Sequence, residues 1–376
     1  MAGRKPGILT KVGLKTFVDP RIGGGRLNSI SNDSLVELME IDGEEYLFYR
    51  AFPIDVAIIR GTTADPHGNI TMEKEAVFLD AMSMAQAVHA NNGTVIVQVE
   101  RLSEEPARPK DVKIPGILVD AIMVAPEQRQ TYFEVYNPNY TGDTRLAEED
   151  LPQFLETLKG RSAAGQTRSL AHYVIARRAA IEAEQGNVVN LGAGIPELVS
   201  WHIESCKECR LTVESGVLGG VPTNGVDFGA SVNPQAIYDQ PNQFDFYDGG
   251  GLDVTFLGAL EVDRFGNVNV SRSGNSVVGI GGFVNISQNA KKVVFCFPFS
   301  VKGMEVSFAD GKLSIDSEGK IIKFCEDVQQ ISFSGEFATE TGQRVLFVTE
   351  RGVFLLKPEG LTLIEVAPGI DPDKPI

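Results

Sequence analysis

The first third of the chain alternates between apolar runs and one amphipathic segment. Residues 54–59 (IDVAII) and 94–99 (TVIVQV) are nearly continuous apolar runs, a pattern typical of strands that are buried on both faces of a parallel sheet. Between them, residues 73–90 carry apolar positions at helical spacing and end at Asn-Asn-Gly. Since strand, crossover helix and strand make up a βαβ unit, the pattern predicts an α/β sheet here.

The rest of the chain contains further periodic segments. Residues 32–38 (NDSLVEL) predict a short capped helix. Residues 128–166 are polar and predict a connection, whereas residues 167–184 predict an amphipathic helix that ends near Gly186. From Val306 onward, Asp-Gly and Glu-Gly turns separate short alternating strands, which predicts a small antiparallel or mixed β region near the C-terminus.

The two halves of the chain repeat one pattern. Residues 53–72 (PIDVAIIRGTTADPHGNITM) align without a gap with residues 251–270 (GLDVTFLGALEVDRFGNVNV). The pairs Asp55/Asp253, Val56/Val254, Asp65/Asp263, Gly68/Gly266 and Asn69/Asn267 are identical. A period this long predicts two tandem, homologous α/β units rather than a solenoid. We expect a first unit over residues 1–127, a linker over 128–166 and a second unit over 167–376.

Composition and charge exclude several classes of protein. Hydrophobic residues make up 43% and charged residues 22% of the chain, as in ordinary globular proteins. The net charge of −16 argues against non-specific binding to nucleic acid. No apolar run approaches the roughly 18 residues of a membrane span. Four Cys and no recognisable signal peptide lead us to expect a cytoplasmic protein that binds neither nucleic acid nor membrane.

A glycine-rich turn follows the apolar run at residues 188–191. Gly192, Ala193 and Gly194 lead into a segment with Pro196 in the first helical turn, a favoured place for proline. Free backbone N–H groups in such a turn favour an anion. A tight strand-to-helix turn that needs glycine only for its backbone is the alternative, and the turn lacks the dinucleotide-binding pattern.

A carboxylate, Glu214, follows the next apolar strand at residues 210–213. Three glycines follow it within six residues, so another molecule can approach its backbone closely. A Glu in this place can act as a base, a ligand or a nucleophile, or it can be a solvated edge residue. Further glycine-rich turns at 249–251 and 279–282 suggest an extended cofactor lying against backbone.

The spacing of the Cys and His residues does not indicate a metal or redox site. Cys206 and Cys209 form one CxxC pair, but only His202 lies near it, and a zinc site needs a fourth ligand. The four His show no metal-binding spacing, so we expect no metal. The repeated Asp55 and Asp253 predict a shared structural role rather than catalysis.

Several longer motifs resemble a known family. The sequences at 213–234 (VESGVLGGVPTNGVDFGASVNP), 244–272 (FDFYDGGGLDVTFLGALEVDRFGNVNVSR) and 281–295 (GGFVNISQNAKKVVF) resemble the family I coenzyme A transferases. The similarity is greatest to the single-chain propionate/acetate CoA-transferases with fused α and β subunits, and it covers nearly the whole chain. It implies two Rossmann-like units with mostly parallel sheets.

The resemblance also implies an activity and its residues. Such an enzyme moves coenzyme A between a short-chain acyl-CoA and a carboxylate by a ping-pong reaction. Glu214 matches the family's nucleophile, which forms a glutamyl-CoA thioester. The expected CoA contacts are Gly192, Ala193, Gly194, Asn267, Gly281 and Gly282. Acyl-CoA is a substrate here, and no permanently bound cofactor is expected.

Compared with the family, the chain lacks an opening βα stretch before Met1 and a stretch after Ile376. We therefore expect truncation at both ends and an incomplete first unit. We also expect a homo-oligomer, or a chain that needs a separate N-terminal fragment. Two alternatives to the transferase stay open: a catalytically silent subunit that binds CoA or a partner, and an acyl-CoA hydrolase.

Overall fold

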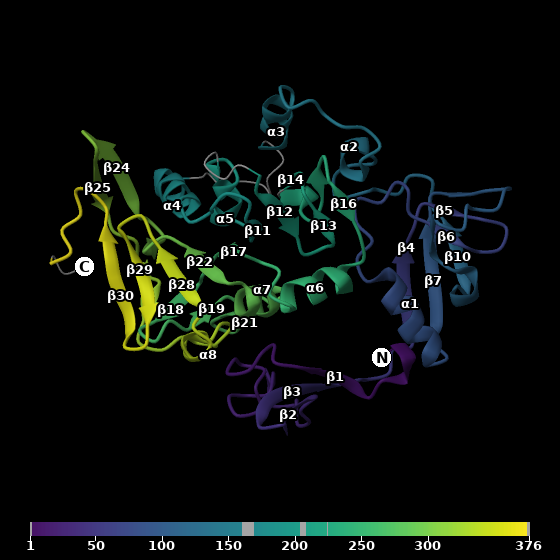
Figure 1. The fold of residues 1–376 in the computed structure, drawn as a ribbon, viewed down its shortest axis with the longest axis horizontal. Coiled ribbons are helices and arrows are strands. Elements are labelled where there is room, and N and C mark those ends of the chain that lie inside the picture. Colours follow the sequence, from purple (N-terminus) through teal and green to yellow (C-terminus); the bar gives the residue numbers. More distant parts are fainter. Residues whose placement is uncertain (1, 160–168, 204–207, 224, 374–376) are drawn as a thin grey trace. The chain divides into compact units, whose positions relative to one another are not determined.

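The computed structural model describes residues 2–159, 169–203, 208–223 and 225–373 (Figure 1). The chain divides into two compact units that are each discontinuous in sequence. Unit 1 comprises Met1–Leu9, Tyr49–Gln166 and Leu211–Asp245, and unit 2 comprises Thr10–Phe48, Thr167–Arg210 and Phe246–Ile376. Each unit is therefore assembled from three separate stretches of the chain. The predicted division into residues 1–127, 128–166 and 167–376 describes repeated sequence segments, and it stays a prediction.

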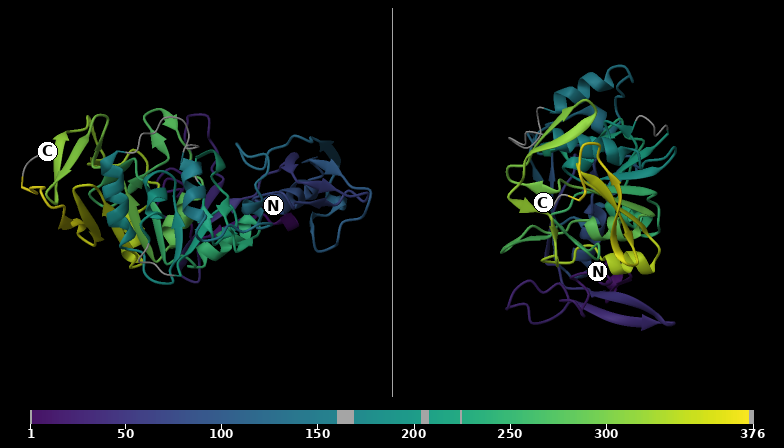
Figure 2. Two further views of the ribbon diagram at one scale, coloured as in Figure 1. Left: turned by 90° about the horizontal axis from the view of Figure 1, so that it is seen from above. Right: turned by 90° about the vertical axis from the view of Figure 1, so that its left-hand side faces the viewer.

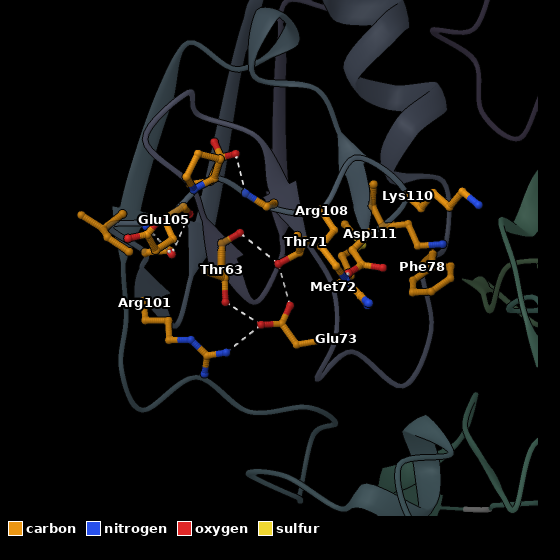
Figure 3. A pocket seen from close by; sticks show the side chains of 16 residues that line it. Thr63, Thr71, Met72, Glu73, Phe78, Arg101, Glu105, Arg108, Lys110 and Asp111 are labelled. Atoms are coloured by element: carbon orange, nitrogen blue, oxygen red, sulfur yellow. Dashed lines mark hydrogen bonds and ion pairs between the residues drawn. The ribbon is translucent and has the colours of Figure 1, made fainter.

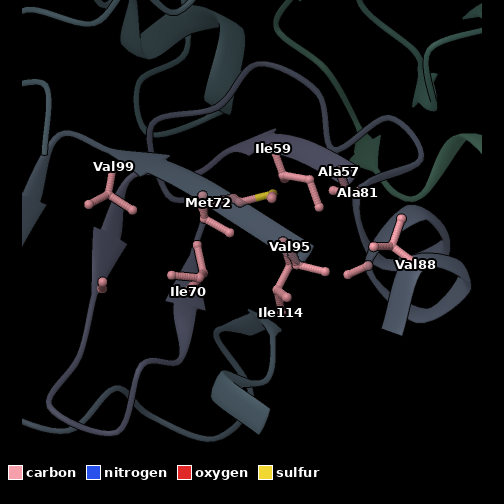
Figure 4. Packing of buried hydrophobic residues seen from close by; sticks show 12 residues of the cluster. Ala57, Ile59, Ile70, Met72, Ala81, Val88, Val95, Val99 and Ile114 are labelled. Carbon is pink, nitrogen blue, oxygen red and sulfur yellow. The ribbon is translucent and has the colours of Figure 1, made fainter. Parts of the chain in front are cut away.

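The core of unit 1 is a three-stranded parallel sheet in the order β10-β7-β4. Its elements are β4 (Val56–Arg60), α1 (Ala81–Ala90), β7 (Thr94–Val99) and β10 (Ala121–Val124). One face packs on α1 and on short neighbouring strands, and Figure 4 shows the buried side chains of this cluster. The opposite face exposes Val56 and Ile58, the latter to 76%. The prediction that this strand is buried on both faces is therefore wrong, because α1 and the core cluster pack on one face only. The predicted βαβ unit is confirmed, although its helix begins only at Ala81, because residues 73–80 form turns and irregular segments instead of helix.

Short elements complete unit 1. A four-stranded sheet has the order β8-β5-β6-β9, and a hairpin joins β12 to β13, which pairs with β16. The bounds are η1 (Ala2–Arg4), β1 (Gly7–Thr10), β5 (Thr63–Ala64), β6 (Ile70–Thr71), β8 (Arg101–Leu102), β9 (Val112–Ile114), η2 (Gly116–Leu118), α2 (Pro138–Thr141), α3 (Leu151–Lys159), β12 (Arg210–Val213), β13 (Val217–Leu218), β14 (Val221–Pro222), η4 (Gly225–Asp227), β15 (Ser231–Val232), β16 (Ala236–Ile237) and α6 (Gln240–Asp248).

Unit 2 is built on a sheet with the order β11-β17-β22-β28-β29-β30. The first four strands are parallel and the last two antiparallel. Helices α4 and α5 cover one face and α7 and α8 the other (Figure 1 and Figure 2). This coverage explains why all of β17 is buried. The bounds are α4 (Leu170–Ala180), β11 (Val188–Leu191), α5 (Ile195–Val199), β17 (Val254–Leu257), α7 (Phe283–Asn289), β22 (Lys292–Cys296), α8 (Gly335–Glu340), β28 (Arg344–Val348), β29 (Gly352–Lys357) and β30 (Gly360–Val366).

Small β elements surround this sheet. They are β2 (Val36–Ile41), β3 (Glu44–Arg50), β18 (Glu261–Asp263), β19 (Val268–Asn269), β20 (Arg272–Ser273), β21 (Ser276–Val277), β23 (Ser300–Val301), β24 (Glu305–Ala309), β25 (Lys312–Ser317), β26 (Ile321–Ile322) and β27 (Phe324–Cys325). The predicted α/β class with parallel sheets is therefore confirmed. None of the helices in the described residues has both the length and the apolar character needed to cross a bilayer.

Two local predictions differ from the structure. The helix predicted at residues 32–38 is wrong, because Val36–Ile41 is a strand that leads through a turn at Asp42 and Gly43 into β3. Strand β28 does not belong to a separate C-terminal β region but pairs in parallel with β22 in the main sheet. Sequence spacing misses this because β28 is as short and apolar as an isolated hairpin strand, and only its partner distinguishes the two cases. The pair β24–β25 is the antiparallel hairpin that was predicted.

The repeated Asp-x-x-Gly-Asn segments form the same turn in both units. Asp65 Oδ1 accepts the backbone N–H of Asn69 at 2.9 Å, and Asn69 Nδ2 donates to Asp65 Oδ2 at 3.0 Å. In the second copy, the two bonds between Asp263 and Asn267 measure 3.0 and 2.9 Å. The strands that precede the two turns, β4 and β17, pair in parallel with β7 and β22 at the same relative register.

Candidate functional site

Glu214 lies in the tight turn of the β12–β13 hairpin. Val213 and Val217 are antiparallel partners, so Glu214, Ser215 and Gly216 make up the whole connection. The Gly216 N–H closes the turn by donating to the Val213 carbonyl at 3.1 Å. The strand predicted before Glu214 is confirmed as β12, and the carboxylate follows its C-terminal end.

Gly216 is required by this turn. Its φ is +100°, and a Cβ at this position would lie 2.0 Å from the backbone oxygen of Tyr238. The Tyr238 N–H in turn donates to the Gly216 carbonyl at 2.9 Å. A side chain at position 216 would therefore push the turn away from the end of β16, and Glu214 with it.

The Glu214 residue is half-buried, and its carboxylate oxygens are unpaired within the described residues. Within the described residues it makes no hydrogen bond and no ion pair, and burial raises its pKa above the usual 4.5. A carboxylate without a cation or a donor keeps its lone pairs free for reaction. The arrangement suits a nucleophile or a base better than a structural residue.

The first predicted CoA-contacting turn joins β11 to α5. The Gly192 N–H donates to the Phe256 carbonyl at 2.8 Å, and a Cβ at Gly192 would lie 3.2 Å from the same oxygen. Ala193 and Gly194 are exposed, and Gly194 has a φ of +91° with no atom near its Cβ position. Gly192 therefore serves the packing of β11 on β17, while Ala193 and Gly194 present open backbone.

The second predicted turn, Gly281–Gly282, precedes α7. Gly281 is exposed, has a φ of +52° and has no atom within 4 Å of its Cβ position. Helix α7 packs on β17 and leads back to the start of β22. It thus runs against the parallel strands, so its first residues and the Gly192–Gly194 turn share the carboxyl edge of the unit 2 sheet, where ligands of such sheets bind.

Asn267 is placed differently from the other predicted CoA contacts. Its Nδ2 donates to Asp263, and its Oδ1 accepts the N–H of Gly335 at 3.0 Å. Asn69 in unit 1 makes the equivalent bond to the N–H of Gly116 at 2.9 Å. Both polar atoms of the Asn267 side chain thus hold a turn, and a contact from this residue to CoA stays a prediction.

Comparison with known proteins identifies the family. Residues 2–125 match the family model described as Coenzyme A transferase. The chain is 45% identical over 388 residues to caffeate CoA-transferase of Acetobacterium woodii, covering 100% of this chain and 71% of that enzyme. It is 43% identical over 380 residues to acetate CoA-transferase YdiF of Escherichia coli (strain K12), covering 100% and 69%.

This chain belongs to the coenzyme A transferase family. The fold agrees: it matches the crystal structure of the acyl-CoA transferase YdiF apoenzyme from E. coli O157:H7 with a TM-score of 0.88, at 41% identity over 98% of this chain and 68% of that chain. A structure of that enzyme described as a thioester complex with CoA matches with a TM-score of 0.87. The resemblance inferred from the motifs is confirmed, and the chain is a transferase.

Unit 1 of this CoA transferase also contains a pocket that sequence analysis did not single out. Its volume is about 710 Å³, and it lies over the sheet β8-β5-β6-β9. Figure 3 shows Glu73 bound on one side by Thr63, Thr71 and Arg101, with Phe78 on the other side. The Arg101 guanidinium lies 2.7 Å from the Glu73 carboxylate, so these two charges compensate each other. The pocket therefore offers no free charge at Glu73.

A half-buried lysine of the transferase was also missed. Lys323 Nζ donates to the carbonyl of Ala259, in the loop after β17, at 2.6 Å. Burial lowers its pKa from 10.5 to about 8. No sequence pattern marks a lone lysine beside a strand as partly buried, so only the pairing of β27 with β18 reveals it.

Cys206 lies outside the described residues, so the CxxC pair has no structural account. Among the residues that the structure describes, no three His, Cys, Asp or Glu side chains gather as metal ligands would.

Proposed function

We propose that this transferase moves coenzyme A between a short-chain acyl-CoA, such as acetyl-, propionyl- or butyryl-CoA, and a free carboxylate, with Glu214 as nucleophile. The observation that carries the proposal is the half-buried Glu214 carboxylate, which has no hydrogen bond or ion pair within the described residues. The acetate transferase YdiF and its thioester complex with CoA support both the substrate class and the covalent route.

The reaction balances as a ping-pong exchange. A Glu214 oxygen attacks the acyl-CoA carbonyl carbon, the C–S bond breaks, and CoA leaves as a thiolate, which yields an acyl-glutamyl anhydride. The thiolate then attacks the glutamyl carbonyl carbon and releases the first carboxylate. The enzyme now holds a glutamyl-CoA thioester, and the acceptor carboxylate repeats the two steps in reverse.

The environment of Glu214 matches this chemistry. A carboxylate is a weak nucleophile, so binding energy from distant parts of CoA must hold the thioester against it. Burial removes water from the carboxylate and raises its pKa, which also makes the ionised form more basic. Each tetrahedral intermediate further needs N–H donors, and removal of one such donor typically costs about 3 kcal/mol.

The glycine turns of unit 2 are the proposed CoA contacts. Ala193, Gly194 and Gly281 present exposed backbone, and no side chain fills the Cβ positions of the two glycines. Gly192 and Gly282 flank these open positions. Pantetheine carries amides that pair with backbone N–H and C=O groups, so an open glycine backbone suits it.

The test is detection of the covalent intermediate. The chain is incubated with acetyl-CoA, treated with borohydride, digested and mapped by mass spectrometry. We expect reduction at Glu214 only after exposure to acyl-CoA, and none in the matched variant Glu214→Gln, which keeps the shape but loses the nucleophile. An unmodified Glu214 in the parent chain would overturn the proposal.

Two further outcomes separate the alternatives. If acyl-CoA is consumed without any acceptor acid, the chain is a hydrolase. If CoA binds without any exchange of label between acetate and acetyl-CoA, the chain is a binding subunit.

A further inference from the structure

Ser215, the neighbour of Glu214, anchors the hairpin turn to a second loop of unit 1. Its side chain is 5% exposed, and its Oγ donates to the Gly229 carbonyl at 2.5 Å. Since Glu214 itself makes no hydrogen bond within the described residues, the direction of its carboxylate depends on the backbone of the turn. The Ser215–Gly229 bond is a side-chain contact of the residue next to Glu214, so it helps to fix this direction.

The loop that contains Gly229 is closed on itself. The Thr223 N–H donates to the Ala230 carbonyl at 3.0 Å, and Thr223 Oγ1 donates to the carbonyls of Asp227 and Ala230. Gly229 has a φ of +106°, which glycine alone adopts easily. The loop thus presents the Gly229 oxygen to Ser215 in a defined position.

Asp227 connects this loop to the segment 128–146. Its side chain is buried and accepts hydrogen bonds from Thr131 Oγ1 and from Tyr140 Oη, the latter at 3.4 Å. Tyr140 is completely buried in a cluster that includes Ala230 and Val232. A buried carboxylate held by two hydroxyl groups resists displacement, because moving it would leave polar atoms without partners.

Backbone contacts strengthen the same connection. The Asn233 N–H donates to the Asn139 carbonyl at 3.0 Å. The Asn233 side chain exchanges two hydrogen bonds with the backbone of Leu146, at 2.9 and 3.0 Å. The segment predicted to begin a linker therefore packs on the loops that follow Glu214.

We propose that Asp227 is a positioning residue for CoA transfer: Thr131 and Tyr140 hold it, it fixes the Gly229 loop, and that loop holds Ser215 and the Glu214 turn. The inference rests on the function proposed above. It extends the reacting site to a segment distant in sequence. A misplacement of about 1 Å at a reacting group can lower a rate about 100-fold, so a loosened anchor acts on the chemical step.

The experiment measures single-turnover formation of the Glu214 thioester from acetyl-CoA, together with the Kd for CoA. We expect Thr131→Val to slow thioester formation about tenfold or more and to leave the Kd for CoA within about twofold. Thr131→Ser, which keeps the hydroxyl group, is expected to restore the rate. A merely structural role would lower the folded fraction without this split between rate and affinity.

The control is Thr63→Val in the same unit. Thr63 is also a half-buried threonine whose Oγ1 donates to a carboxylate, that of Glu73 at 2.6 Å, but it lies outside the Asp227 network. We expect this variant to react at the parental rate. If Thr131→Val does not fold, Tyr140→Phe removes the second hydroxyl and serves in its place.

The outcomes separate the two proposals. If the parent chain forms no adduct at Glu214, the proposed function fails. If the parent forms it and the folded Thr131→Val or Tyr140→Phe variant does so at the same rate, only the positioning role is overturned.

Discussion

Asn267 and Asp263 are joined by two hydrogen bonds, one from the Asn267 backbone N–H and one from its side-chain Nδ2, at 3.0 and 2.9 Å. The same two bonds join Asn69 to Asp65 in unit 1. In each copy the asparagine Oδ1 also accepts an N–H from a glycine, Gly335 or Gly116, about fifty to seventy positions further along. The same Asp-x-x-Gly-Asn turn thus occurs in both units, and in each its asparagine bonds to a loop that is distant in sequence.

Replacement of Asn267 by Ala is expected to act on stability more than on CoA binding. Loss of the bonds to Asp263 and Gly335 leaves polar groups unsatisfied and should lower the free energy of unfolding by about 2 kcal/mol. Asn69→Ala is the matched variant and should cost a similar amount. Urea denaturation and the Kd for CoA are measured for both. A loss of CoA affinity in Asn267→Ala at unchanged stability would contradict the structural role.

At acid pH, the fall of kcat/KM should follow the protonation of Glu214. Attack requires the ionised carboxylate, and burial raises the pKa of Glu214 above 4.5, so protonation removes the nucleophile at a pH above that value. We expect kcat/KM for acetyl-CoA to fall with a midpoint above 4.5. Thermal melts at each pH show whether the chain remains folded. A midpoint at or below 4.5 in folded protein would speak against a buried nucleophile.

Alanine variants of two glycines should differ, because a Cβ at Gly216 would clash with Tyr238 and one at Gly281 would not. Gly216→Ala places a Cβ 2.0 Å from the Tyr238 oxygen, so we expect loss of thioester formation and of stability. In stability, Gly281→Ala bears only the cost of its positive φ, about 1–2 kcal/mol, because its Cβ meets no atom of the described residues within 4 Å. Any loss of thioester formation in this variant would then report its proposed contact with CoA. Differential scanning calorimetry and the adduct assay measure both. An equal loss of stability at the two positions would show that the Gly216 turn can rearrange.

Lys323 should make stability depend on pH in the alkaline range. Its folded pKa of about 8 lies below the ordinary 10.5, so the folded state disfavours the charged form by about 3 kcal/mol. This penalty is fully present below pH 8 and disappears as the pH rises to 10.5, because the unfolded chain then loses its proton too.

Lys323→Met removes the charge, so we expect a higher free energy of unfolding than in the parent at pH 7. The difference between the two should shrink as the pH approaches 10, as measured by denaturant titration. Lys110→Met, at an exposed lysine, is the control and should show no such trend. A difference that stays constant with pH would mean that Lys323 is solvated.

Periodicity predicted the central strands well. Residues 54–59 and 94–99 contain β4 and β7, because a short, nearly continuous apolar run favours a strand. The predicted burial of both faces is wrong for β4, whose Val56 and Ile58 are exposed. The helix predicted at residues 32–38 failed, because Val36–Ile41 is held as a strand beside β3, an interaction that no local pattern encodes. The same limit applies to β28, whose parallel partner β22 lies about fifty residues earlier.

Some residues of the candidate site could be predicted from the sequence, and others are recognised only in the structure. Sequence motifs were sufficient to single out Glu214 and the glycine turns, because these residues are contiguous and their chemistry is local. They said nothing of Lys323 or of the link from Asp227 to Thr131 and Tyr140, which joins residues 87 or more positions apart.

The sequence by itself determined the family, the α/β class and the position of Glu214 at the end of a strand, because short runs of neighbouring residues are sufficient to recognise each of them. The tertiary structure decided which groups are buried, which are paired and which loops hold the Glu214 turn. Burial and pairing depend on residues that meet only after folding. A pKa shift or a hydrogen-bonded anchor therefore belongs to the packed molecule and not to any segment of it.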